Sequence, residues 1–148
     1  MINVKLSCDK AINKKFKTYG IKKRKLENLL TLFVNDECAT RKWWWYDIRV
    51  TGMKGTTSGY VWDSDKLEIA LRAAYCNTQK ERELYFVQSI VHEFCHWVQN
   101  RIMKVPSKAL DYSDKDVDNR TENYLNNVHE IHARAWEDKV EGMMHFLK

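Results

Sequence analysis

Several features are scarce in this 148-residue sequence, and each scarcity excludes a class of protein. One proline and five glycines exclude collagen-like and low-complexity chains. No apolar run approaches the roughly 18 residues that a membrane-spanning helix needs, and the first residues lack the apolar block of a signal peptide. We therefore expect one folded domain over residues 1–148 that resides in the cytoplasm and does not contact a membrane.

Cysteine is also sparse, and its spacing carries information. Cys8, Cys38, Cys76 and Cys95 are far apart in the chain, so no C-x-x-C pair suggests a zinc ribbon or a redox motif. Free thiols are typical of proteins in a reducing compartment. We expect four free cysteines, with Cys95 in the core.

The net charge of +5 is concentrated at one end of the chain. Residues 1–25 hold nine Lys or Arg side chains and one acidic residue, whereas the remainder is slightly acidic. Closely spaced cations can follow a nucleic-acid backbone or bind an acidic partner. The composition favours a solvated surface for this basic N-terminal segment, with nucleic acid or an acidic partner as the alternative.

The first half of the chain predicts a helix followed by a small sheet. Residues up to about Val34 are mostly helix formers, and apolar residues recur at helical spacing after Gly20. Alternating patterns then predict strands near residues 43–50, 57–62 and 67–72. The turns between them are short, which indicates a three-stranded antiparallel sheet. Aromatic residues in a strand are more often core than binding surface, so we expect Trp43–Trp45 to be structural.

The second half predicts two helices. Thr78 and Glu81 have the spacing of a capping box, and the apolar periodicity after them continues to about Ile102, before Pro106. A final helix is predicted from about Thr121 to Phe146. Its expected inward residues are Tyr124, Val128, Ile131, Ala135, Trp136, Val140, Met143 and Leu147. The expected fold class is α+β.

The first of these two helices contains His92, Glu93 and His96 in the pattern H-E-x-x-H. Four residues are just over one helical turn, so both imidazoles project from one face and can converge on a single metal ion. Glu93 is offset from that face, so its carboxylate can reach a water molecule at the metal. The pattern therefore predicts a metal site with Glu93 as general base.

Over roughly residues 42–140 the sequence resembles the zincin metallopeptidases. The resemblance implies a zincin-like core, one Zn²⁺ per chain, a peptide or protein substrate and a third ligand from a downstream helix. In the glutamate-ligand zincins a glutamate fills that place, and Glu130 matches it. Ala133 lies one turn further along on the same face and would let the two helices approach closely.

Two alternatives for the third ligand, His129 and His132, remain open. Thermolysin-like members carry an aspartate four residues after the glutamate, where this chain has Arg134, and the metzincin extension is absent. The motif helix, HEFCHWVQ, is also similar to that of SprT-like DNA-associated proteases, which use a third histidine. That second resemblance implies a nucleic-acid-associated or regulatory protein as the alternative function.

The zincin resemblance implies hydrolysis of a peptide bond. Glu93 would take a proton from the attacking water and later return it to the leaving amine. A donor to the negative charge on the carbonyl oxygen is also needed, and the candidates are Tyr112, Tyr124, His129 and His132. The predicted strand at residues 67–72 precedes the motif helix and is the expected site of peptide pairing.

Overall fold

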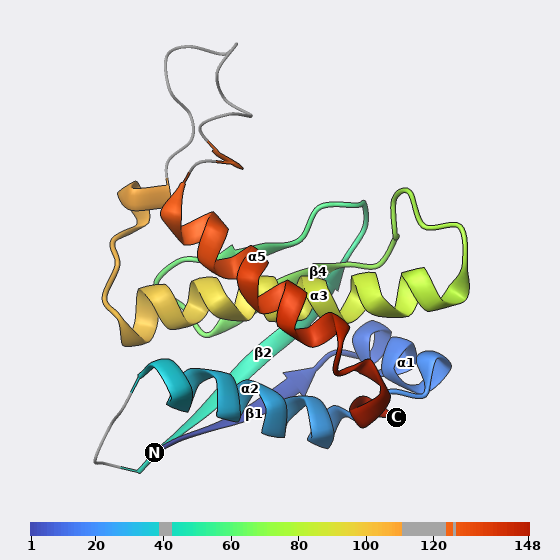
Figure 1. Ribbon diagram of the computed structural model, residues 1–148, viewed down its shortest axis with the longest axis horizontal. Coiled ribbons are helices and arrows are strands. Elements are labelled where there is room, and N and C mark those ends of the chain that lie inside the picture. The colour runs from blue at the N-terminus through green and yellow to red at the C-terminus, as the bar shows by residue number, and fades with distance from the viewer. Residues whose placement is uncertain (39–42, 111–123, 126) are drawn as a thin grey trace.

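The chain folds as an α+β protein around a mixed four-stranded sheet (Figure 1). The computed structural model describes residues 1–38, 43–110, 124–125 and 127–148. The strands are β1 (Ile2–Cys8), β2 (Trp44–Met53), β3 (Gly59–Val61) and β4 (Lys66–Ala70). Their order across the sheet is β1-β2-β4-β3, with β1 and β4 parallel to β2, and β3 antiparallel to β4. The predicted class is confirmed, but the predicted three-stranded antiparallel sheet is wrong.

Strand β1 accounts for much of that error. Ile2, Val4 and Leu6 are buried and alternate with more exposed residues, the period-two pattern of a strand with one covered face. The lysine-rich sequence that follows directly obscured this short signal. β1 pairs with β2 along its whole length, so the predicted helical N-terminus actually begins with a sheet strand.

The helices pack on one face and along one edge of the sheet. They are α1 (Lys10–Tyr19), α2 (Lys23–Glu37), α3 (Gln79–Trp97) and α5 (Val128–Glu141). In Figure 1, α3 lies between the sheet and α5, which crosses in front of it. The helix predicted after Gly20 is confirmed as α2, and Gly20 itself, with a φ of 64°, ends α1 in the left-handed conformation.

Helix α2 covers the outer edge of β1 with side-chain hydrogen bonds. Its side chains Glu27, Thr31 and Asn35 accept hydrogen bonds from the N–H groups of Leu6, Val4 and Ile2 at 2.7, 3.1 and 2.8 Å. Four helical residues rise about 6 Å, close to the roughly 6.6 Å spanned by two strand residues, so the two repeats stay in step. Asn35 also donates to the carbonyl of Ile2.

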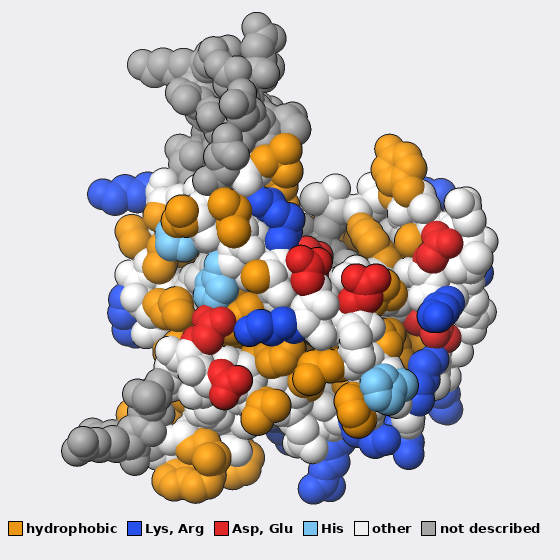
Figure 2. Space-filling model, viewed as in Figure 1, with side chains coloured by type: hydrophobic (Ala, Val, Ile, Leu, Met, Phe, Trp, Pro, Cys, Tyr) orange, Lys and Arg blue, Asp and Glu red, His pale blue; other side chains and the backbone are white. Residues whose placement is uncertain are grey.

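The basic N-terminal segment is folded rather than extended. It forms β1, α1 and the start of α2, and its cations remain at the surface: Lys14, Lys17, Lys22 and Lys25 are exposed. Figure 2 shows Lys and Arg side chains gathered over α1 and the beginning of α2.

The three tryptophans at the start of β2 are not core residues. Trp43, Trp44 and Trp45 are 65%, 51% and 74% exposed. Sequence reasoning placed them inside because aromatic strand residues are usually covered, but Trp43 precedes the strand and Trp44 and Trp45 pair with β1 only at its first residues. The hydrophobic core is instead built from β1, the middle of β2, β4 and the inner faces of the helices.

Helix α3 begins where the capping pattern predicts. The Thr78 hydroxyl accepts from the N–H of Glu81 at 3.1 Å, and the Glu81 carboxylate accepts from the N–H of Asn77. The predicted continuation towards Ile102 is present as a wider, π-helical turn over Val98–Ile102.

Helix α5 begins with an Asn127 cap at Val128 in the described part of the chain; the predicted start at Thr121 lies outside the described residues. Its buried face is Glu130, Ala133, Trp136 and Val140. Of the residues predicted to face inward, Trp136, Val140 and Leu147 are buried, whereas Val128, Ile131 and Ala135 are exposed. Among the described residues, no helix is long and apolar enough to cross a membrane.

Candidate metal centre

The two histidines of the motif lie on one face of α3 and point towards α5. Their ring centroids are 4.8 Å apart, as expected for residues one turn apart. Glu130 reaches them from α5, one turn before Ala133, which is fully buried and lets the helices lie close together. His96 and Glu130 are buried, and His92 is nearly so.

The ligand atoms of these side chains converge on one point. The Nε2 atoms of His92 and His96 are 3.2 Å apart, and they lie 3.0 and 2.9 Å from the two carboxylate oxygens of Glu130. Zinc–ligand bonds of 2.0–2.1 Å in a tetrahedron place neighbouring ligand atoms roughly 3.3–3.4 Å apart. Two histidines and a glutamate are also a known catalytic zinc donor set. The donor set therefore suits a zinc ion, and the ligand atoms need to separate by only a few tenths of an ångström to hold it.

Gln99 determines which nitrogen of His96 faces the centre. The Gln99 amide nitrogen donates to the backbone carbonyl of His129 at 2.9 Å, and a carbonyl can only accept, so the amide orientation is settled. Its oxygen must then face Nδ1 of His96, at 2.8 Å, and accept a hydrogen bond from the N–H at that position. Nε2 of His96 is left with the free lone pair that a metal ligand needs.

The same amide group links the centre to α2. Its second N–H donates to Nδ1 of His132 at 3.0 Å, so Nε2 of His132 carries the proton that Glu37 accepts at 2.6 Å. The other Glu37 oxygen accepts from the indole N–H of Trp136. His132 is thus held in a polar chain away from the centre.

The side chains of His129 and His132 are not part of the cluster. Among the described residues, the group that could share one ion is His92, His96 and Glu130, with all ligand atoms within 4.8 Å of one another. His129 contributes its backbone carbonyl to Gln99, and its side chain is half-buried. Of the three alternatives for the third ligand, the structure brings only Glu130 to the histidines.

His92 is supported by a second carboxylate. Its Nδ1 lies 3.5 Å from Glu137, one turn beyond Ala133 on α5, an arrangement that commonly orients metal-binding histidines. Burial alone lowers the pKa of His92, but the hydrogen bonds to Glu130 and Glu137 and the charge of Glu93 outweigh it and raise the pKa to about 10. The surroundings strongly favour positive charge at this point.

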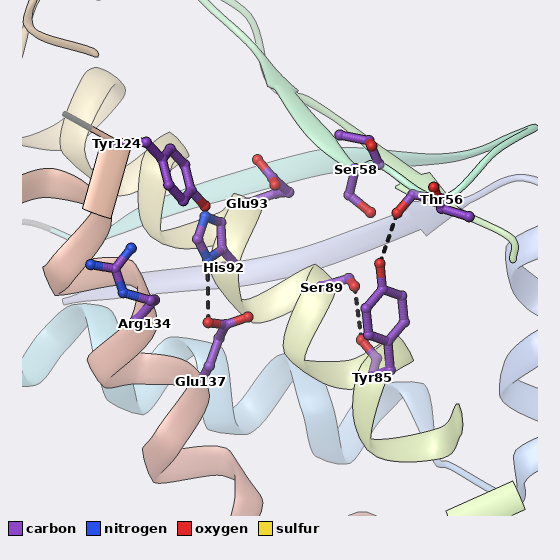
Figure 3. Close-up of a pocket in the computed structure, with 10 residues that line it drawn as sticks. Thr56, Ser58, Tyr85, Ser89, His92, Glu93, Tyr124, Arg134 and Glu137 are labelled. Carbon is purple, nitrogen blue, oxygen red and sulfur yellow. Dashed lines mark hydrogen bonds and ion pairs between the residues drawn. The ribbon is translucent and has the colours of Figure 1, made fainter. Parts of the chain in front are cut away.

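Glu93 lies beside the centre and faces a pocket. Figure 3 shows it across the pocket from Tyr124, with His92 between them. It is 7% exposed, and burial raises the pKa of its carboxyl group against the opposing charges of His92 and His96. The pocket has a volume of about 240 Å³. A raised pKa beside an open space is typical of a general base.

Of the predicted donors to a carbonyl oxygen, Tyr124 reaches the pocket. Its hydroxyl points towards His92 in Figure 3. Burial and the nearby Glu130 carboxylate raise the pKa of Tyr124 to about 12, so its hydroxyl stays protonated at neutral pH. Tyr112 lies outside the described residues.

The strand predicted to pair with a peptide is not available. β4 covers residues 66–70 of the predicted 67–72 segment, and β2 and β3 occupy its two edges. The segment that borders the pocket is instead Thr56–Ser58, just before β3. It is anchored by Tyr85, whose hydroxyl donates to the carbonyl of Thr56, and by Ser58, which accepts from the N–H of Ala70.

Sequence reasoning missed several residues around the centre. Gln99 lies three positions after His96, and Arg134 and Glu137 lie four and seven after Glu130, so helical spacing alone would place each on the face of a ligand. Glu37 gave no such signal, because it comes from a helix almost a hundred residues away in the chain.

Comparisons of this chain with protein-family models, curated proteins and solved structures give no match. The geometry of the cluster is therefore the basis for the functional conclusion that follows.

Proposed function

We propose that this chain is a zinc-dependent metallopeptidase of zincin type, with His92, His96 and Glu130 as ligands and Glu93 as general base. The observation that carries the proposal is the close approach of the two histidine Nε2 atoms to each other and to the two Glu130 carboxylate oxygens, at 2.9–3.2 Å, at a buried point beside a pocket. Three charged or chargeable groups this close are costly to bury unless something shares their lone pairs. A divalent cation does so.

When bound, zinc would supply Lewis-acid chemistry to a substrate carbonyl and to water, with its fourth position open. Glu93 lies at the pocket wall and accepts the proton of the attacking water. It then returns that proton to the amine of the leaving half of the peptide. Tyr124, held protonated by its raised pKa, donates a hydrogen bond to the negative charge that develops on the carbonyl oxygen.

The walls of the pocket would orient the substrate. Thr56–Ser58 continues into β3, the antiparallel edge strand, so an extended peptide laid along this segment passes Glu93. The anchors of this segment, Tyr85 and Ser58, keep the wall in place.

The first test is zinc per chain by elemental analysis. We expect one zinc in the unmodified protein, loss of zinc in Glu130→Ala, and retention in His132→Ala and in the control His145→Ala, which changes an exposed histidine in the last turn of the chain. Absence of zinc after the unmodified protein has been offered the metal and dialysed would contradict the proposal.

The second test separates catalysis from metal binding. Glu93→Gln should keep its zinc, because the amide leaves all three ligands intact. Its hydrolysis of a quenched-fluorescence peptide library should fall by at least about 100-fold, because the base is lost. Undiminished turnover would exclude Glu93 as the base.

A second candidate function is binding of nucleic acid or an acidic partner. The observation that favours it is the gathering of exposed cations over α1 and the start of α2 (Figure 2). Replacing residues 22–25 with alanine should then weaken binding to a fluorescent oligonucleotide and flatten its salt dependence. No binding by the unmodified protein at low salt would end this hypothesis.

A further inference from the structure

One cation of the pocket has no partner of opposite charge among the described residues. Arg134 is the one Lys or Arg among the described residues that line the pocket, and no ion pair joins it to any residue in the described part of the chain. Its Nη2 donates to the carbonyl of Leu125 at 2.6 Å, and its guanidinium lies over the ring of Tyr124. These contacts hold the side chain in place without neutralising it.

The guanidinium also has unused donor capacity. Nη1 is buried and has no hydrogen-bond partner among the described residues. A partly buried guanidinium normally pairs with a carboxylate or phosphate, because leaving its N–H groups and charge unsatisfied is costly. The site can therefore accept an anionic group from outside the described part of the chain.

The placement of Arg134 relates that anion to the proposed chemistry. Arg134 lies four residues after Glu130 on α5, about 6 Å along the helix axis and on the same side. In Figure 3 Arg134 lies beside His92, with Tyr124 above it and Glu137 below it. Glu93 and Glu137 would repel an anion, so Arg134 is the lining residue that can accept a negative group.

We propose that Arg134 binds a carboxylate of the substrate, one residue beyond the bond that is cleaved. Successive Cα atoms are about 3.8 Å apart, so a carboxylate at this position would lie one residue away from the cleaved bond. The group is either the terminal carboxylate of a peptide or an acidic side chain at that position. This inference rests on the proposed function, because the position of the carboxylate is defined relative to the bond cleaved at the metal centre.

The test uses a matched pair of zinc-binding probes. Succinic acid monohydroxamate and its monoamide carry the same metal-binding group and differ in a single carboxylate. Calorimetric titration of the zinc-loaded protein should show about tenfold tighter binding of the acid, since charge-assisted hydrogen bonds are the stronger ones. The preference should disappear in Arg134→Gln, with zinc content and affinity for the amide unchanged. Arg134→Lys should retain part of it.

A matched control is Arg49→Gln, which changes an exposed arginine that lines a different surface pocket on the sheet and should keep the full preference. Equal affinity of the unmodified protein for the two probes would overturn the role of Arg134 and leave the zinc site standing. Failure of both probes to bind, together with absence of zinc, would instead overturn the proposed function. If Arg134→Gln does not fold, the role of Arg134 is still tested by comparing the affinities of acid and amide for the unmodified protein and for Arg134→Lys.

Peptides distinguish the two sources of the carboxylate. Three versions of one peptide are compared. The first ends in a free carboxylate, the second ends in an amide, and the third ends in an amide and has glutamate as its last residue. Cleavage of the free acid alone identifies a carboxy-terminal exopeptidase, and cleavage of the glutamate amide as well identifies recognition of acidic side chains. Equal cleavage of all three peptides would contradict the inference.

Discussion

Two regions of this protein bury polar side chains at close quarters, and they do so in opposite ways. Along the β1 edge, the α2 side chains Glu27, Thr31 and Asn35 each accept a backbone N–H. Between α3 and α5, the side chains of His92, His96 and Glu130 face one another.

The difference separates polar groups that complete the fold from polar groups that could hold a metal ion. At the β1 edge every acceptor meets a donor already in the chain, so the arrangement is saturated. At the candidate metal centre the acceptor atoms of three side chains face one another. Their lone pairs repel unless a proton or a cation lies between them. Burial of polar residues is therefore uninformative about function until their partners are traced.

The largest expected effect is the stabilisation of the folded protein by zinc at the metal centre. Zinc at a thousandfold excess over its dissociation constant should raise the free energy of unfolding by about 4 kcal/mol, because it binds the folded state alone. Urea unfolding with zinc and with a chelator measures this. His92→Ala should lose the effect and His145→Ala should keep it; equal stabilisation of both variants would place the zinc elsewhere.

The second prediction concerns the loss of side-chain hydrogen bonds at the β1 edge. Asn35→Leu leaves the N–H and carbonyl of Ile2 unpaired, which should reduce the free energy of unfolding by about 2–3 kcal/mol. Zinc per chain should not change. Asn28→Leu, an exposed position on the same helix, is the control. Loss of zinc in Asn35→Leu would show that the two regions are coupled.

The third prediction tests the support of His96. Gln99→Leu removes the acceptor that holds the Nδ1 proton of His96, and zinc affinity should fall by about 10–100-fold, the usual cost of losing such a support. Competition with a fluorescent chelator measures it. Gln79→Leu at the exposed start of α3 should have no effect. Unchanged affinity in Gln99→Leu would mean that packing alone orients the ring.

The smallest effect concerns a buried polar cluster that is saturated without a metal. Tyr60 donates to the carbonyl of Ser64, and its hydroxyl also contacts Oδ1 of Asn100. Burial raises the pKa of Tyr60 to about 12. The folded state therefore holds the phenolic proton more tightly than the unfolded state, and this stabilisation is present below pH 10 and lost as the pH rises towards 12.

Tyr60→Phe should accordingly cost about 1 kcal/mol at pH 8, and the difference from the unmodified protein should narrow above pH 10. Urea unfolding at both pH values measures the two gaps. A gap that stays constant with pH would show that the hydroxyl does not stabilise the fold through its proton.

The parts of this fold that were predictable from the sequence are those with local signals. The cap at Thr78, the periodicity of α3 and the H-E-x-x-H spacing are all set within one or two helical turns, and the structure has them. Glu130 was named through the resemblance to glutamate-ligand zincins, and the sequence alone left His129 and His132 open as alternatives.

What failed depends on partners distant in the chain. β1 is a strand because β2 and α2 lie on its two sides, and neither is adjacent in sequence. The predicted antiparallel pairing of β3 with β4, which are close in sequence, is present, whereas β2 pairs in parallel with β4 and not with β3. On α5, Trp136 and Val140 are buried as predicted, whereas Val128 and Ile131 are exposed because the buried face at the start of the helix is formed by the polar Glu130 and by Ala133.

The saturated edge of β1 has a consequence for self-association. Exposed strand edges recruit strands from other molecules and are where folded sheets begin to aggregate, which many proteins prevent with bulges, prolines or charges on the edge. Here the side chains of α2 act as a surrogate strand, repeating at the spacing of the backbone they cover. Of the two outer strands that the structure describes, only the three-residue β3 is not covered in this way.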